Sequence, residues 1–205
     1  PVAGAGRVKT ILSETATVLE DLARDVLELM NQGADLDTIV HTVKVDPDLL
    51  SRPWLKPRYD DPEFAIHNVW RQFGGWWDGD AATLKPAPTA ALATELATLA
   101  GGADRLAARA LELSTSDADA DLRLACHLAE MAGRAAPDDG GVHEIRAEVY
   151  GRRRKRETSL MAKGIYADAV RRSKLANERC PRAAIGPVPA AQHETAPTEP
   201  AAHHP

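Results

Sequence analysis

The sequence of 205 residues predicts an all-α fold, a multi-helix bundle, and three observations support this class. First, 44% of the residues are hydrophobic but only 4% are aromatic. The apolar residues are mainly alanine and leucine, which favour helices, rather than the β-branched and aromatic runs that favour strands. Second, apolar residues recur every three or four positions, which is the period of a helix face. Third, glycines and Asp-Pro pairs separate these segments where helices typically end or begin.

The first half of the chain is expected to contain four helices. A long one runs from Arg7 to Gln32 with a single apolar stripe, and a shorter one follows from Leu36 to Val43. The pairs Asp46-Pro47 and Asp61-Pro62 each place a capping carboxylate before a proline, which the first helical position tolerates. They predict two further helix starts. The last of these helices ends at Gly74-Gly75, because glycine accepts a positive φ at a helix end.

The second half is expected to contain five helices. They begin at Thr89 and Asp104, after the polar break Ser114–Asp121, after the turn Pro137–Gly141, and at Ser159. The pair around the Pro137–Gly141 turn has alanines at its contact positions. It resembles a single tetratricopeptide-like helical hairpin in the C-terminal half of the chain, although one copy without a repeat does not predict a solenoid.

The domain organisation follows from a change in composition. Residues 7–175 are predicted to form one helical domain. Residues 176–205 are predicted to be a disordered tail, because from Pro181 onward the chain is rich in proline and alanine and has no apolar period.

Charge and cysteine content exclude several classes of protein. The net charge of −5 argues against a nucleic-acid binder, which would present a basic field to phosphates. No apolar run approaches the ~20 residues that span a bilayer, so no membrane span is expected. Cys126 and Cys180 lack CxxC spacing and form no disulfide framework. The compartment is not determined: a cytoplasmic location is favoured, and the periplasm or secretion is the alternative if a signal precedes Pro1.

Three of the four tryptophans lie in one short stretch between Trp70 and Pro88. Indoles bring a large, rigid apolar area, so Trp76 and Trp77 are expected to pack the turn after Gly75 against something buried. The stretch is interpreted as a device for packing or for an interface. Its sequence contains no nucleophile with an accompanying base.

This stretch resembles the dimerisation domain of the alkyl sulfatases that hydrolyse dodecyl sulfate. The residues that carry the resemblance, or stand within its motif, are Asn68, Trp70, Arg71, Gly75, Trp76, Trp77, Asp78, Gly79 and Pro86. Asp80 and Ala81 stand where the family has Asn-Pro, and later segments such as Gly101–Asp104 and Glu157–Gly164 match in order. The resemblance covers about residues 7 to 173. It implies a structural or interface role for the motif residues and a homodimer as the assembly.

The resemblance also places the chemistry of such enzymes outside this domain. Full-length members carry an upstream metallo-β-lactamase-type domain with two zinc ions, bound by a His-x-His-x-Asp-His cluster, and a downstream sterol-carrier-like domain. Neither pattern occurs in this sequence, and none of the seven histidines is spaced to share a metal ion. We therefore expect no catalytic residue, no metal ligand and no cofactor in this chain. A zinc-bearing catalytic domain is an expected partner, in the same chain or a separate one.

Three functions are compatible with these observations. The leading hypothesis is a homodimerisation module of an alkyl sulfatase. The second is a part of a complete or two-chain enzyme that contributes to the substrate channel; Arg58 and Tyr59 are then the candidates for contacting the sulfate ester. The third is a tetratricopeptide-like adaptor that binds a peptide along the edge formed by Arg123, His127, Glu130 and Arg134.

Two local patterns are given structural interpretations. The run of basic residues from Arg152 to Arg156 points in all directions around a helix, so it is interpreted as solvated rather than as a binding stripe. Cys126-His127 has no second ligand pair nearby and is interpreted as a buried cysteine beside a surface histidine.

Overall fold

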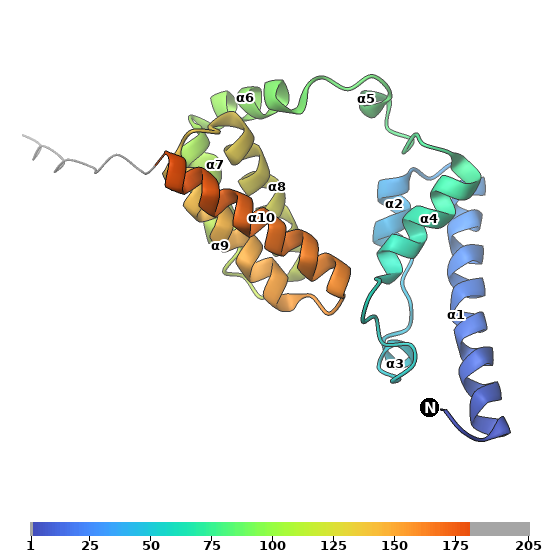
Figure 1. Cartoon of the computed structure of the whole chain (residues 1–205). Coiled ribbons are helices and arrows are strands. Elements are labelled where there is room, and N and C mark those ends of the chain that lie inside the picture. The colour runs from blue at the N-terminus through green and yellow to red at the C-terminus, as the bar shows by residue number, and fades with distance from the viewer. Residues whose placement is uncertain (1, 181–205) are drawn as a thin grey trace, which may run out of the picture.

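The computed structural model describes residues 2–180, which contain ten helices and no strand. The helices are α1 (Ala5–Asn31), α2 (Leu36–Thr42), α3 (Pro47–Leu50), α4 (Pro62–Gly74), α5 (Ala81–Leu84), α6 (Thr89–Ala100), α7 (Ala103–Leu113), α8 (Asp119–Ala135), α9 (Gly140–Arg156) and α10 (Leu160–Arg179). The all-α prediction is confirmed. Figure 1 shows two groups of helices, joined across the top of the view by α5 and the segments on either side of it.

The N-terminal lobe consists of α1 to α4. Helices α2 and α4 pack against α1 and against each other. Its core is small, and the six buried apolar side chains in it are Leu22, Val26, Ile39, Val40, Val43 and Ile66. The predicted Asp-Pro starts are confirmed, since the Asp46 and Asp61 carboxylates accept backbone N–H bonds at the starts of α3 and α4.

The C-terminal lobe consists of α6 to α10, and its core is rich in alanine. Alanines of α6, α7 and α8 are buried around Leu106, Leu122, Val142 and Val149, so these helices approach one another closely. Helix α10 packs along α9, and the rings of Tyr150 and Tyr166 stack with centroids 5.8 Å apart. Helices α8 and α9 pack together, as expected for the predicted hairpin around the Pro137–Gly141 turn. The resemblance of this hairpin to a tetratricopeptide unit stays a prediction.

The strap, residues 75–88, connects the two lobes and begins with the tryptophan turn. The Trp70 indole donates to the carbonyl of Trp77 at 2.9 Å, and the backbone N–H of Leu36 donates to Asp78 at 2.9 Å. These bonds hold the turn to the N-terminal lobe. Gly79 has a φ of +95°, and an added Cβ would lie 2.9 Å from that of Asp35, so a side chain would not fit here.

The prediction that both turn indoles are buried is wrong. The side chain of Trp76 is 75% exposed and that of Trp77 is 39% exposed. Trp70 packs against the small core of this lobe, whereas Trp76 and Trp77 do not belong to that cluster or to the side chains packed on it.

Helix ends differ from the predictions by a few residues at most sites. Helix α6 begins at Thr89 as predicted, with Pro88 at its N-cap position, and α7 begins at Ala103, one residue before the predicted Asp104. Helix α10 continues to Arg179, four residues into the segment predicted to be a tail. The rest of the predicted tail, residues 181–205, lies outside the described residues.

Candidate functional site

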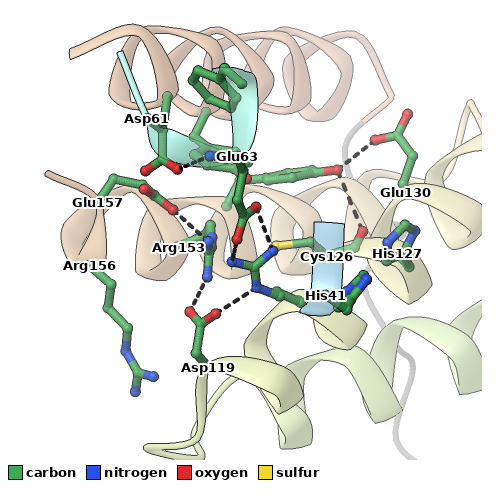
Figure 2. A pocket seen from close by; sticks show the side chains of 15 residues that line it. His41, Asp61, Glu63, Asp119, Cys126, His127, Glu130, Arg153, Arg156 and Glu157 are labelled. Carbon is green, nitrogen blue, oxygen red and sulfur yellow. Dashed lines mark hydrogen bonds and ion pairs between the residues drawn. The ribbon is translucent and has the colours of Figure 1, made fainter. Parts of the chain in front are cut away.

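A cleft with a volume of about 610 Å³ lies between the two lobes, and charged side chains line most of it. The N-terminal lobe contributes side chains that include Asp61 and Glu63, while α8, α9 and α10 contribute the opposite wall. Figure 2 shows that the Arg153 guanidinium group and the carboxylates of Asp119 and Glu157 point toward one another, whereas Arg156 points away from them. The cleft is therefore a place where the lobes meet through charge.

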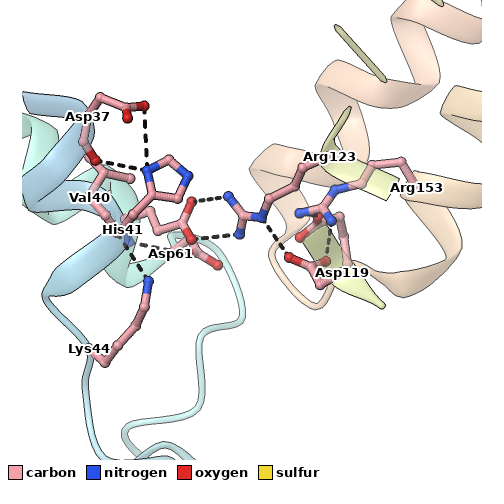
Figure 3. A network of polar contacts seen from close by, with 10 residues as sticks. Asp37, Val40, His41, Lys44, Asp61, Asp119, Arg123 and Arg153 are labelled. Carbon is pink, nitrogen blue, oxygen red and sulfur yellow. Dashed lines mark hydrogen bonds and ion pairs between the residues drawn. The ribbon is translucent and has the colours of Figure 1, made fainter. Parts of the chain in front are cut away.

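Arg123 makes the central contact of the cleft. Its guanidinium group donates to both carboxylate oxygens of Glu63 at 2.6 and 3.0 Å, and it also donates to Asp119 at 2.6 Å (Figure 3). A two-point contact of this kind fixes orientation as well as distance. Glu63 belongs to α4 and Arg123 to α8, so this ion pair joins the two lobes across 60 residues of sequence.

Arg153 extends the charged network inside the C-terminal lobe. It pairs with Asp119 and with Glu157, the latter at 2.7 Å, and its guanidinium carbon lies 5.8 Å from the centre of the Tyr166 ring. The residue is only 7% exposed. The solvated interpretation of the Arg152–Arg156 run is therefore wrong for Arg153, because its helix face turns toward α10 and the start of α8.

The network shifts the pKa values of its carboxyl groups. Burial alone would raise the pKa of Glu63, but the hydrogen bonds and charge of Arg123 outweigh burial and lower it. Burial also tends to raise the pKa of Asp119, but the hydrogen bonds and charges of Arg123 and Arg153 have the larger effect and lower it. The pKa of Glu157 is raised, mainly by burial and also by the neighbouring charges of Asp61 and Asp119.

The cleft lacks an activated thiol nucleophile. Burial raises the pKa of the Cys126 thiol to about 11, so the thiol is protonated at neutral pH and a poor nucleophile.

Within residues 2–180 no group of three or more His, Cys, Asp or Glu side chains could hold a metal ion, so these residues do not fit a zinc site. No helix in the same range is long and apolar enough to cross a membrane.

Arg58 and Tyr59 lie at the junction of the lobes, and their backbone carbonyls make the contacts to the C-terminal lobe. Their carbonyls accept bonds from the Leu160 and Met161 N–H groups at 2.7 and 3.2 Å, at the start of α10. The Ser159 hydroxyl also donates to the Tyr59 carbonyl at 2.8 Å. Both side chains are exposed, that of Tyr59 by 67%, and they do not line the cleft. Their contact with a sulfate ester stays a prediction.

The predicted peptide-binding edge on α8 faces the cleft. Arg123 is engaged by Glu63, and the Glu130 carboxylate binds Arg134 and Arg146, the latter at 2.6 Å. His127 of this edge is exposed. The N-terminal lobe thus engages Arg123 of this edge, and peptide binding along the edge stays a prediction.

The remaining motif residues divide between structure and surface. Trp70, Trp77, Asp78 and Gly79 build the turn through the contacts given above. Asn68, Arg71, Gly75, Trp76 and Pro86 are exposed. These residues are accessible to a partner, which is compatible with the predicted interface role.

A second exposed apolar surface lies on α1. Val8, Leu12 and Leu19 form a stripe along the helix and are 38%, 65% and 55% exposed. The helix has 27 residues, and its buried residues, Leu22 and Val26, lie in its C-terminal half, so the stripe in its N-terminal half stays uncovered. Sequence periodicity identified these residues as apolar but gave no indication that the chain's own core leaves them uncovered.

A sequence model of a family described as alkyl sulfatase dimerisation matches residues 35–175. The chain is 28% identical over 155 residues to a linear primary-alkylsulfatase of a Pseudomonas species, covering 74% of this chain and 28% of that protein. It is 29% identical over 111 residues to an alkyl/aryl-sulfatase of Saccharomyces cerevisiae, covering 54% of this chain and 17% of the yeast protein.

A solved structure shares the fold. The stereoselective inverting sec-alkylsulfatase Pisa1 from a Pseudomonas species superposes with a TM-score of 0.73 at 23% sequence identity, over 84% of this chain and 27% of that protein. The chain thus spans between about a sixth and a little over a quarter of the length of these relatives.

Proposed function

This chain belongs to the alkyl sulfatase dimerisation family, and we propose that it serves as a homodimerisation domain whose partner is a second copy of itself. The proposed contact face is the α1 stripe together with the tryptophan turn. Burying such apolar surface between two copies is the main favourable contribution to association.

The observation that carries the proposal is the uncovered stripe of α1. A helix of 27 residues is ~40 Å long, which is enough to present a large part of the ~800 Å² per partner that a stable interface buries. Val8, Leu12 and Leu19 continue the apolar face of Leu22 and Val26 toward the N-terminal end of α1, beyond the part of that face that belongs to the core. A second copy would cover them.

Two substitutions on the stripe test this proposal. We expect the double variant Leu12→Lys, Leu19→Lys to raise the dissociation constant of the dimer by at least about a hundredfold, because each leucine contributes about 1.5–3 kcal/mol when buried. Sedimentation equilibrium measures the constant, and circular dichroism checks that the helices persist. Thr17→Lys is the matched control, because Thr17 is an exposed residue of the same helix outside the stripe.

An unchanged dissociation constant in the double variant would exclude the α1 face as the contact. Weakening by Thr17→Lys to the same degree would show that any added charge on α1 disturbs assembly, and would equally count against the stripe.

A second candidate function is participation in sulfate-ester hydrolysis as one part of an alkyl sulfatase. The relatives named above are alkylsulfatases of greater length, and Arg58 and Tyr59 present a guanidinium group and a phenol on the exposed connector between α3 and α4. These groups suit a sulfate oxyanion. Dodecyl sulfate is the proposed substrate, and a zinc-bearing domain would supply the reaction.

The test joins this chain to a zinc-bearing alkylsulfatase domain and measures hydrolysis of dodecyl sulfate. If the two residues contact the ester, Arg58→Gln and Tyr59→Phe raise KM, while Lys56→Gln on the same connector does not. Equal kinetics in all three variants would remove Arg58 and Tyr59 from the substrate path and leave the dimerisation proposal untouched.

A further inference from the structure

The two lobes share no apolar core. Each of the three clusters of buried residues lies wholly within one lobe, and in the described part of the chain helices pack only against helices of their own lobe. Covalently the lobes are joined by the strap, whose Pro86 and Pro88 are exposed. Their relative position therefore depends on a few polar contacts.

Two groups of polar contacts bridge the lobes in residues 2–180. One is the Glu63–Arg123 ion pair at the cleft. The other is the set of three hydrogen bonds from residues 159–161 to the carbonyls of residues 58 and 59. Small polar interfaces between units of one chain normally permit movement of the units, whereas large apolar ones prevent it.

We propose that the Glu63–Arg123 ion pair is a latch that holds the N-terminal lobe closed over the cleft. When this pair is broken, the three hydrogen bonds to the carbonyls of residues 58 and 59 no longer suffice to hold the lobes together, and the lobes move apart as rigid bodies. The strap acts as the hinge. Opening uncovers the cleft wall formed by α8, α9 and α10, including Cys126.

The latch is strong enough to hold the closed state and weak enough to release it. Its geometry is bidentate, which favours the closed state. However, the Arg123 and Glu63 side chains remain 36% and 28% exposed, so water and salt screen their attraction. Arg123 keeps a second partner, Asp119, after opening, so its positive charge remains paired.

Cys126 is a built-in reporter of opening, because it lines the cleft that the N-terminal lobe covers. The experiment uses the full chain with Cys180→Ser, which leaves Cys126 as its one thiol. The alkylation rate with N-ethylmaleimide is compared between this parent and the added substitution Glu63→Gln. We expect the latch variant to react about fivefold faster or more, which is the factor expected when one partly exposed ion pair is lost.

Glu148→Gln is the matched control. It removes one ion pair of the same kind, to Arg152 at 2.5 Å, within α9 and away from the lobe junction. Its alkylation rate should equal that of the parent. Salt near 1 M, where the screening length is about 3 Å, should speed alkylation of the parent but not of the latch variant.

Helical circular dichroism should be unchanged in the latch variant, and its radius of gyration from small-angle X-ray scattering should increase. An alkylation rate equal to that of the parent would overturn the latch, as would equal acceleration by Glu148→Gln. Faster alkylation accompanied by loss of helical signal would also overturn it, since that result means local unfolding and not movement of lobes.

Discussion

Arg153 shows that the environment of a single residue is not readable from a run of charges. It stands among five basic residues of one helix, yet it alone of the five is buried, and it pairs with Asp119 and Glu157. The sequence contained a usable hint: Glu157 lies four residues later, at the spacing of a helical ion pair. Asp119, 34 residues earlier, left no local signal.

Removal of the Arg153 charge should be strongly destabilising. In Arg153→Met we expect the free energy of unfolding to fall by about 3 kcal/mol, because the largely buried Glu157 carboxylate loses its counter-ion, whereas Asp119 keeps Arg123. Arg154→Met, a neighbouring exposed residue, should change it by less than about 0.5 kcal/mol. Urea titration of both variants measures the difference. Equal losses would mean that Arg153 is solvated after all.

Substitutions of Trp76 and Trp70 should affect the free energy of unfolding of the monomer to different degrees. At concentrations low enough for the monomer, Trp76→Ala should cost less than about 1 kcal/mol, because the ring is 75% exposed. Trp70→Ala should cost about 3 kcal/mol, since its ring packs on the core and its N–H holds the turn. Chemical unfolding of the dilute variants gives both values. A large loss in dilute Trp76→Ala would show that the turn is packed differently.

The carboxylates of the network predict an acid-sensitive fold. Glu63 and Asp119 have lowered pKa values, so the stability that they contribute is present above their unfolded values of 4.5 and 3.8 and is lost as pH falls through the lowered folded values. Glu157 has a raised pKa, so its contribution has the opposite sign: it is present below 4.5 and lost as pH rises through the folded value.

The free energy of unfolding should therefore decrease between about pH 5 and pH 2. Glu63→Gln should remove about 1 kcal/mol of that decrease, the scale found for partly exposed pairs. Unfolding curves taken at several pH values measure the slope. A slope identical in the wild type and Glu63→Gln would show that Arg123 does not stabilise the charged form of Glu63.

At the scale of the elements, the starts and periods of the helices were predictable because they depend on neighbouring residues. The Asp-Pro pairs at Asp46 and Asp61 cap helices as expected, and α1 differs from the predicted Arg7–Gln32 by two residues at its start. The short helix α5 was missed, although Asp80 caps it, since a four-residue helix shows no period.

Contacts between distant elements could not be predicted in this way. The start of α10 is satisfied by carbonyls of residues 58 and 59, about 100 residues earlier. The exposure of Trp76 and of the α1 stripe depends on how far the small core of the N-terminal lobe extends, which is set by packing and not by apolar content. The family motif marked the turn correctly, but not which of its indoles is covered.

At the scale of the whole molecule, the chain is two small helical lobes with separate cores, a polar junction and apolar surfaces that face outward. These features suit a domain whose exposed apolar surfaces become buried when it associates with a partner. A fold that exposes leucines along one helix and an indole at a turn is better explained by a second copy than by a solvated monomer.

The mass of the wild-type chain in solution tests this account most directly. Light scattering coupled to size-exclusion chromatography at micromolar concentration should give twice the chain mass of 22.0 kDa. A mass of one chain across the same concentration range would contradict the claim that the exposed apolar surfaces of this domain pair with a second copy.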